Sequence, residues 1–281
     1  MAGVTARADI DLETLRKRAL RIRREIIEST TAAGSGHPTT SLSGVEIAVA
    51  LYFGGILRHD PKRPQWRDRD RFILSEGHAA PLLYAVLAEA GYFPAAELMT
   101  LRKFGSPLEG HPNMRKVPGV EASTGSLGEG LSIGIGHALA GRLDKKDYHV
   151  FVMTGDGEID EGQIWEAAMA AVHFNLSNLT LIVNNNDFQQ TGPVEKVMNT
   201  KPIADKFESF GWLTVAVDGH DLGAVHEALA VPRHSTEGQP QCVVAHTVKG
   251  KGVSFIEGPL GYHGRALTPE EATRALAELA E

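Results

Sequence analysis

The sequence predicts an α/β protein with a doubly wound, mostly parallel sheet flanked by helices. Short apolar runs of strand length alternate along the chain with segments of helical periodicity. Polar turns that contain glycine follow two of these runs, at 75–78 and 155–157. The composition, 42% hydrophobic and 22% charged over 281 residues, is sufficient for a large core. The predicted strands cover residues 71–74, 149–154, 179–183, 213–217 and 241–247.

The N-terminal third is predicted to be mainly helical. Apolar side chains recur every three or four residues over 12–31, which indicates a helix whose Arg and Lys side chains form a solvated face. The glycines and proline of 34–38 break this helix. Ser43, with Glu46 three residues later, has the register of a capping box for a second helix. A further helix is predicted over 79–90, after the first strand.

The remaining helices are predicted over 128–143, 163–174, 202–210, 222–229 and 267–281. The first of these is rich in glycine, which indicates close packing against either a neighbouring chain or its own sheet. The last has Thr268 as its cap and Pro269 at its first position.

Residues 104–126 form a predicted loop with little periodicity, and a loop of this length is more often functional than idle. The chain has no internal repeat and no composition shift. We therefore expect one domain over 1–281, with 1–10 as a flexible N-terminal extension.

Composition excludes several classes of function. A net charge of −7 argues against nucleic-acid or anionic-membrane binding. The single cysteine, Cys242, excludes a disulfide framework, and we expect it to be buried in a strand. The chain shows no secretory signal and no apolar stretch of membrane-spanning length. These features predict a cytoplasmic protein that does not bind membranes.

Asp156 and Asn186 indicate a metal site. They follow the apolar runs 149–154 and 179–183, and one strand-helix-strand unit separates them. Such a unit returns the second strand parallel to the first, so both residues should emerge at the same carboxyl edge of the sheet. Carboxylate and amide oxygens suit Mg²⁺, and the glycines flanking Asp156 allow close approach to a phosphate. The pattern predicts a metal that holds a diphosphate.

Four turns place a histidine beside a glycine: His37, His78, His111 and His263. Histidine carries protons near neutral pH and donates hydrogen bonds to phosphate or carbonyl oxygen. The spacings do not suit zinc, and neither a P-loop nor a dinucleotide fingerprint is present. From the residues alone, the prediction is a metal–diphosphate site with loop histidines, and no reaction follows.

Together these segments resemble the N-terminal, diphosphate-binding half of transketolases, a family of thiamine-diphosphate enzymes. The resemblance runs from about residue 12 to residue 265. It implies the diphosphate-domain version of the thiamine-diphosphate-binding fold. The matching stretches are 35–38, 74–79, 110–112, 118–128, 155–157 with Asn186, 249–252 and 262–264.

The resemblance also implies roles for individual residues. Asp156 and Asn186 would be side-chain ligands of Mg²⁺ or Ca²⁺, with the backbone carbonyl of Phe188 as a third ligand. His37, His111 and His263 would face the sugar hydroxyls and share proton transfers. The implied cofactor-binding residues are His78, Gly125, Ser126, Leu127, Gly155, Asp156, Gly157, Glu158, Asn186, Lys249 and His263.

Transketolases usually continue into a pyrimidine-binding domain and a C-terminal domain, and this sequence stops before them. The resemblance therefore implies the N-terminal subunit of a split transketolase. A separately encoded partner would carry the other two domains, in a heterotetramer with two copies of each chain. The reaction would transfer a two-carbon ketol unit from a ketose phosphate to an aldose phosphate, as in the pentose phosphate pathway.

Three alternatives stay open. One is a subunit of an enzyme like 1-deoxyxylulose-5-phosphate synthase, and another is a transketolase for a specialised sugar. The third is a non-catalytic subunit that binds the cofactor and regulates a partner. Thr39, Glu129 and His137 depart from the usual family pattern, and their roles are not predicted.

Overall fold

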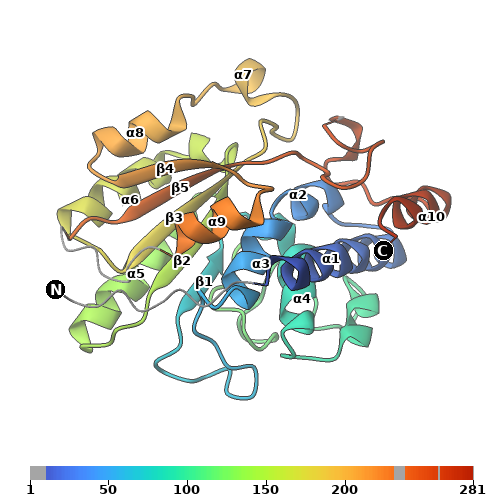
Figure 1. Ribbon diagram of the computed structural model, residues 1–281, viewed down its shortest axis with the longest axis horizontal. Helices are drawn as coiled ribbons and strands as arrows, with labels where there is room; N and C mark the ends of the chain where they lie inside the picture. Colours follow the sequence, from blue (N-terminus) through green and yellow to red (C-terminus); the bar gives the residue numbers. More distant parts are fainter. Residues whose placement is uncertain (1–10, 231–237, 259, 281) are drawn as a thin grey trace.

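The computed structural model describes residues 11–230, 238–258 and 260–280, so the predicted extension at 1–10 lies outside the described residues. Within them, five strands form one parallel sheet in the order β1-β2-β3-β5-β4 (Figure 1). The parallel sheet confirms the predicted fold class, and every strand lies within two residues of its predicted bounds. The strands are β1 (Arg71–Leu74), β2 (Val150–Gly155), β3 (Leu179–Asn185), β4 (Leu213–Asp218) and β5 (Gln241–His246).

Helices cover both faces of the sheet (Figure 1). On one face lie α1 (Leu12–Ala33), α2 (Pro38–Ser43), α3 (Val45–Phe53), α4 (Ala80–Glu89), α9 (Leu222–Leu229) and α10 (Pro269–Glu278). On the other face lie α5 (Glu129–Leu143), α6 (Gly162–His173) and α8 (Ile203–Ser209). The short helix α7 (Val194–Val197) lies between β3 and α8, and single 3-10 turns cover Gly77–Ala79, Ala95–Thr100, Glu158–Asp160 and Leu260–Tyr262.

Alternate residues along a strand pack into two separate hydrophobic cores. Phe72 and Leu74 of β1 belong to the core under α1, α3 and α4, whereas Ile73 belongs to the core under α5 and α6. Strands buried on both faces read as continuous apolar runs. Cys242 of β5 is fully buried, which confirms its predicted place in a strand. None of the described helices is long and apolar enough to cross a membrane.

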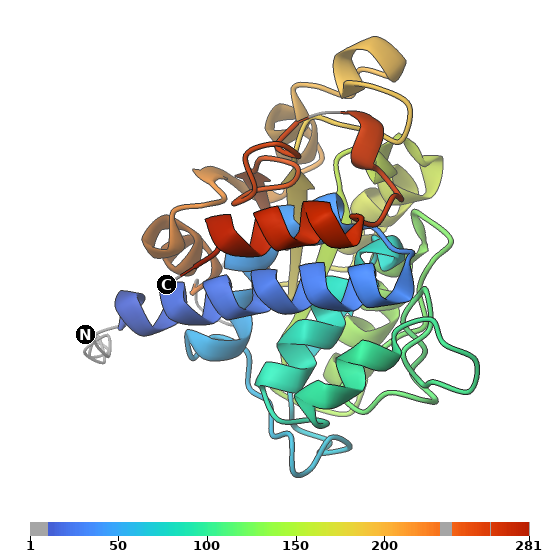
Figure 2. The same cartoon turned by 90° about the vertical axis from the view of Figure 1, so that its right-hand side faces the viewer.

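The C-terminal helix α10 lies along α1 (Figure 2). The Thr268 side chain accepts a hydrogen bond from Glu271 N, and the Glu271 carboxylate accepts one from Thr268 N, which confirms Thr268 as the cap. At the other end, the Arg24 guanidinium donates to the carbonyls of Leu276 and Leu279. The end of the described chain is therefore fastened to its first helix.

Two predictions near the N-terminus are wrong. Ser43 does not cap a second helix: it is the last residue of α2, and its hydroxyl donates to Thr40 O at 2.7 Å. Gly44 precedes α3, and Glu46 forms an ion pair with Arg23. Arg23 is correspondingly buried rather than part of the solvated face of α1. Glu46 and Arg23 thus pair with each other across two helices, instead of forming the local cap and the solvated face that the sequence suggests.

The glycines of α5 pack against the sheet of the same chain. A Cβ atom at Gly130 would collide with Ser75, and one at Gly134 would collide with Val152 of β2. Gly136, by contrast, has no described atom within 4 Å of such a position. Of the two interpretations of this helix, packing against its own sheet accounts for Gly130 and Gly134.

This packing predicts opposite effects for two equivalent substitutions. Gly134→Ala should lower the free energy of unfolding by about 1–3 kcal/mol, because the methyl group overfills the contact with Val152. Gly136→Ala should be neutral or raise that free energy by up to about 1 kcal/mol, because alanine favours the helix. Urea unfolding of the two variants measures this. Equal effects of the two substitutions would contradict the packing explanation.

Candidate active site

The ends of β2 and β3 bring the predicted metal ligands together. Asp156 follows β2, and its carboxylate accepts hydrogen bonds from Gly157 N at 2.9 Å and from Asp187 N at 2.5 Å. Asn186 follows β3, and its side-chain oxygen accepts from Phe188 N at 3.2 Å. The Asp156 carboxylate thus bonds directly to the loop that carries Asn186 and Phe188.

The three consecutive asparagines Asn184, Asn185 and Asn186 bond to different parts of the protein. Asn184 is committed to the protein: its amide donates to Ser43 Oγ and to Glu76 Oε1, both at 2.9 Å, and its oxygen accepts from Thr247. Asn185 turns away and donates to His246 Nδ1 at 2.9 Å. Asn186 also bonds within the protein, through its amide to Ser43 Oγ at 3.4 Å, and its role as a metal ligand stays a prediction.

Three buried carboxylates meet at this edge. Asp156 and Glu76 are each 1% exposed and Glu158 is 3% exposed. Burial raises the pKa of Asp156 to about 7 and that of Glu76 to about 8. Among the described residues, none of these carboxylates has an ion-pair partner within 4.0 Å. The edge therefore concentrates buried acidic groups that lack a direct cationic partner.

Lys249 is a buried cation whose charge acts on this edge. Its side chain is 3% exposed, and burial lowers its pKa to about 8. Its positive charge in turn lowers the pKa values of Asp156 and Glu76, against the larger effect of their burial. The Lys249 ammonium donates to His263 Nδ1 at 2.8 Å. Lys249 thus links the acidic edge to the histidines.

Glu158 ties the surrounding turns together. One of its carboxylate oxygens accepts from Ser75 Oγ at 2.5 Å and from Gly128 N at 2.9 Å, and the other accepts from Gly155 N at 3.2 Å. These donors lie after β1, before α5 and at the end of β2. Glu158 thus links three turns of the site, and its contact with a cofactor stays a prediction.

Three of the predicted histidines form a cluster. The ring centroids of His37 and His78 are 5.0 Å apart, those of His37 and His263 are 5.2 Å apart, and those of His78 and His263 are 5.6 Å apart. His37 caps α2, His78 lies in the turn after β1, and His263 follows the last 3-10 turn. Three distant parts of the chain thus supply one wall of the site.

Burial keeps this cluster uncharged. It lowers the pKa of His37 to about 4 and the pKa values of His78 and His263 to about 3. Because Lys249 donates to Nδ1 of His263, the proton of that neutral ring lies on Nε2. The Nδ1 atom of His37 is buried and has no hydrogen-bond partner among the described residues. The cluster therefore offers both donors and acceptors to a ligand at neutral pH.

The predicted long loop brings His111 to the same wall. The described segment 104–126 has no helix or strand. A Cβ at Gly125 would lie 3.0 Å from the His111 ring, and one at Gly77 would lie 2.7 Å from the Gly125 backbone. Ser126 and Leu127 follow as exposed residues. The structure thus places His111 and 125–127 beside the turn that carries His78.

Arg102 is a site residue that the sequence did not indicate. Its guanidinium donates to Ser35 Oγ at 3.0 Å and to Gly110 O at 3.3 Å. Its charge lowers the pKa values of His37 and His111, in addition to the effect of their burial. No local motif marks Arg102, because an irregular loop folds it against residues far away in the sequence.

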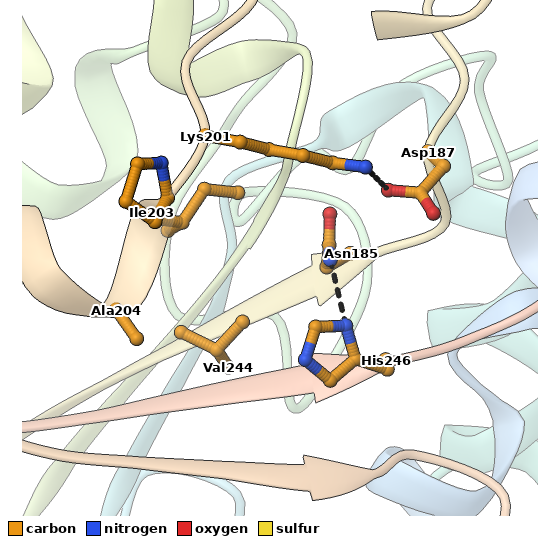
Figure 3. A pocket seen from close by; sticks show the side chains of 8 residues that line it. Asn185, Asp187, Lys201, Ile203, Ala204, Val244 and His246 are labelled. Carbon is orange, nitrogen blue, oxygen red and sulfur yellow. Dashed lines mark hydrogen bonds and ion pairs between the residues drawn. The ribbon is translucent and has the colours of Figure 1, made fainter. Parts of the chain in front are cut away.

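The loop after β3 lies against the turn that follows β2. The side chain of Gln189 lies against Gly157, where a Cβ would come 2.7 Å from Gln189 Cγ, and its amide donates to Asp160 Oδ2. Beyond this loop is a cavity of about 400 Å³. Figure 3 shows Lys201 reaching across it to Asp187, with an ion pair of 3.0 Å. This ion pair fastens the residue that follows the predicted ligand Asn186.

The residues present fit a dication bound with a diphosphate. In the described part of the chain, no three His, Cys, Asp or Glu side chains are grouped to hold a metal alone. A site with Asp156, the Asn186 amide and the Phe188 carbonyl would need further oxygen ligands from a bound molecule. Mg²⁺ commonly binds in this way, through one or two carboxylates plus phosphate oxygens.

Known proteins are similar to this chain in sequence and in fold. Residues 15–279 match the family model described as "Transketolase, thiamine diphosphate binding domain". The chain is 41% identical to mouse transketolase over 269 residues, which are 95% of this chain and 42% of that protein. The transketolase structure from Campylobacter jejuni matches with a TM-score of 0.89 at 30% identity, over 96% of this chain and 43% of that one.

Two other relatives match over nearly their whole length. The 6-deoxy-6-sulfo-D-fructose transketolase subunit SqwG of a Clostridium strain is 41% identical, over 92% of this chain and 93% of that protein. An apulose-4-phosphate transketolase subunit from Phocaeicola vulgatus is 38% identical, over 97% of this chain and 96% of that protein. The chain thus spans less than half of mouse transketolase but nearly all of these two relatives.

Burial of Glu76 predicts a pH-dependent stability. A carboxyl whose pKa is raised on folding contributes stability below its unfolded pKa and loses it as the pH rises through the folded value. Relative to Glu76→Gln, the metal-free parent should therefore lose up to several kcal/mol of unfolding free energy between about pH 5 and pH 8. Urea unfolding at both pH values measures the difference. A constant difference would show that folding does not raise the pKa of the Glu76 carboxyl.

Proposed function

The chain belongs to the transketolase family through its thiamine-diphosphate-binding domain, and from this membership we propose that it is the N-terminal subunit of a two-chain transketolase. The observation that carries the proposal is the near-complete match, in both directions, to two proteins named as transketolase subunits. A separately encoded partner supplies the pyrimidine and C-terminal domains. Two copies of each chain form the enzyme, which is cytoplasmic.

The acidic edge holds the cofactor. Bound thiamine diphosphate supplies the carbon nucleophile for breaking and forming carbon–carbon bonds. Asp156, Asn186 and the Phe188 carbonyl hold Mg²⁺ or Ca²⁺, whose charge offsets the buried carboxylates. Lys249 and Gly157 lie against the diphosphate. The remaining contacts to the cofactor come from His78, Gly125, Ser126, Leu127, Gly155 and Glu158.

The histidines handle the substrate. His37, His111 and His263 face the sugar hydroxyls, and neutral imidazoles can accept a proton at one nitrogen and donate one at the other. The low pKa values of His37 and His263 keep those two rings in this neutral state at physiological pH. Arg102 offers a cation to the phosphorylated sugar beside His37 and His111. The reaction transfers a two-carbon ketol unit from a ketose phosphate to an aldose phosphate, in the pentose phosphate pathway or in the breakdown of a specialised sugar.

Removal of the metal ligand tests the cofactor site. Asp156→Ala should abolish Mg²⁺-dependent retention of thiamine diphosphate by the assembled enzyme, because a dication then lacks its only carboxylate ligand. Asp68→Asn is the control, since Asp68 is a partly exposed acid paired with Lys146. Gel filtration followed by cofactor assay measures retention. Parent-like retention by Asp156→Ala would rule out the metal assignment.

The subunit proposal predicts that the isolated chain cannot turn over substrate. The chain should transfer ketol units once it is mixed with a partner that carries the pyrimidine and C-terminal domains. The gene for this partner is to be sought first in the adjacent reading frame. A coupled assay with xylulose 5-phosphate and ribose 5-phosphate measures this, with pyruvate as donor to detect synthase activity. Full turnover by the isolated chain would refute the need for a partner.

A further inference from the structure

The backbone around Lys249 is held from two sides. Lys249 lies in the segment 247–252 that follows β5, and its long side chain is buried. The position of the Lys249 ammonium therefore depends on how firmly the backbone of 247–252 is held. A short chain of three side chains, Arg23, Glu46 and His220, contacts this backbone on both sides of Lys249.

His220 holds the N-terminal side. It lies in the turn between β4 and α9, and its Nε2 atom accepts a hydrogen bond from Val248 N at 2.8 Å. With Nε2 as an acceptor, Nδ1 of the neutral ring carries the proton and donates to Glu46 Oε2 at 2.9 Å. Both nitrogens of His220 are thus used, and one of them orients the residue next to Lys249.

Arg23 holds the C-terminal side. Its Nη1 and Nη2 atoms pair with the two oxygens of Glu46 at 2.7 and 2.8 Å, in a bidentate geometry. Its Nε atom donates to Lys251 O at 3.1 Å. Gly252 has a φ of 96°, and a Cβ there would approach Arg23 Cδ to 3.0 Å. The backbone therefore comes close to Arg23 at a place where only glycine fits without strain.

The buried carboxylate of Glu46 bonds to both Arg23 and His220, and so links the contacts that these two residues make with the backbone. Burial alone would raise the pKa of Glu46, but Arg23 and His220 keep it at about 2, so the carboxylate stays ionised. Each of its oxygens has a defined partner. A shift of Glu46 would therefore displace the contacts at Val248 and Lys251 together.

We propose that Arg23, Glu46 and His220 are positioning residues for Lys249, which fix the backbone on both of its sides and so set the reach of its ammonium. The inference rests on the proposed function in one respect, namely that Lys249 contacts the cofactor diphosphate. A purely structural ion pair between α1 and α3 would stabilise the fold without affecting cofactor affinity.

Substitutions at His220 separate the two roles. His220→Asn keeps a donor near Glu46 but is too short to reach Val248 N, whereas His220→Gln can present an acceptor to that amide. His226→Asn is the matched control, because His226 Nε2 bonds to the Gly54 carbonyl at 2.8 Å, away from the segment 247–252. Two measurements are made: amide hydrogen exchange of 247–252 in the full chain, and thiamine diphosphate affinity of the complex with Mg²⁺.

His220→Asn should speed exchange in 247–252 and weaken cofactor binding about tenfold, the effect of one buried hydrogen bond. With His220→Gln, the exchange rate of 247–252 and the cofactor affinity should both stay close to those of the parent. With His226→Asn, neither quantity should change. The proposal is overturned if His220→Asn behaves like His226→Asn, or if exchange rises while affinity stays unchanged. A parent complex that binds no thiamine diphosphate refutes the proposed function instead, and the exchange measurement still decides whether His220 holds the segment.

Discussion

The burial of three carboxylates at the carboxyl edge of β2 is the constraint on which the rest of the site depends. Asp156, Glu76 and Glu158 are all nearly inaccessible to water. Burying acidic groups without ion-pair partners is costly unless hydrogen bonds, protonation or a cation compensate. The structure uses all the local means: backbone amides bond to Asp156 and Glu158, the Asn184 amide bonds to Glu76, and Lys249 lies close by. We propose that the positive charge of a bound dication completes this compensation.

The same enclosure explains the histidine wall. A site closed enough to bury carboxylates also removes water from His37, His78 and His263, which therefore remain neutral. Neutral rings can exchange hydrogen bonds with hydroxyl groups without repelling a cation. Lys249 belongs to both halves of the arrangement, since it faces the acids and donates to His263. Its backbone is accordingly the point where the layer of α1, α3 and α9 meets the site.

The sequence predicted the sheet, the sheet edge at which Asp156 and Asn186 meet and the turns that carry the histidines, because each depends on local pattern. Apolar runs mark the strands, and parallel strands must end at one edge, so Asp156 and Asn186 had to approach each other. A local pattern cannot identify partners that come from distant parts of the sequence. Glu46 had the register of a cap but pairs with Arg23, and Arg102 reaches the site through an irregular loop. Periodicity shows which face a residue occupies and not what it meets there. The prediction of a single domain over 1–281 stays a prediction.

We propose that this edge binds a metal and a diphosphate through Asp156, Asn186 and Phe188. A crystal structure of the assembled enzyme with thiamine diphosphate, grown with Mn²⁺ in place of Mg²⁺, tests it most directly. We expect an anomalous peak for a Mn²⁺ ion that is bound to the Asp156 carboxylate, the Asn186 side-chain oxygen, the Phe188 carbonyl and oxygens of the diphosphate. A Mn²⁺ peak away from Asp156, or a diphosphate bound elsewhere, would contradict it.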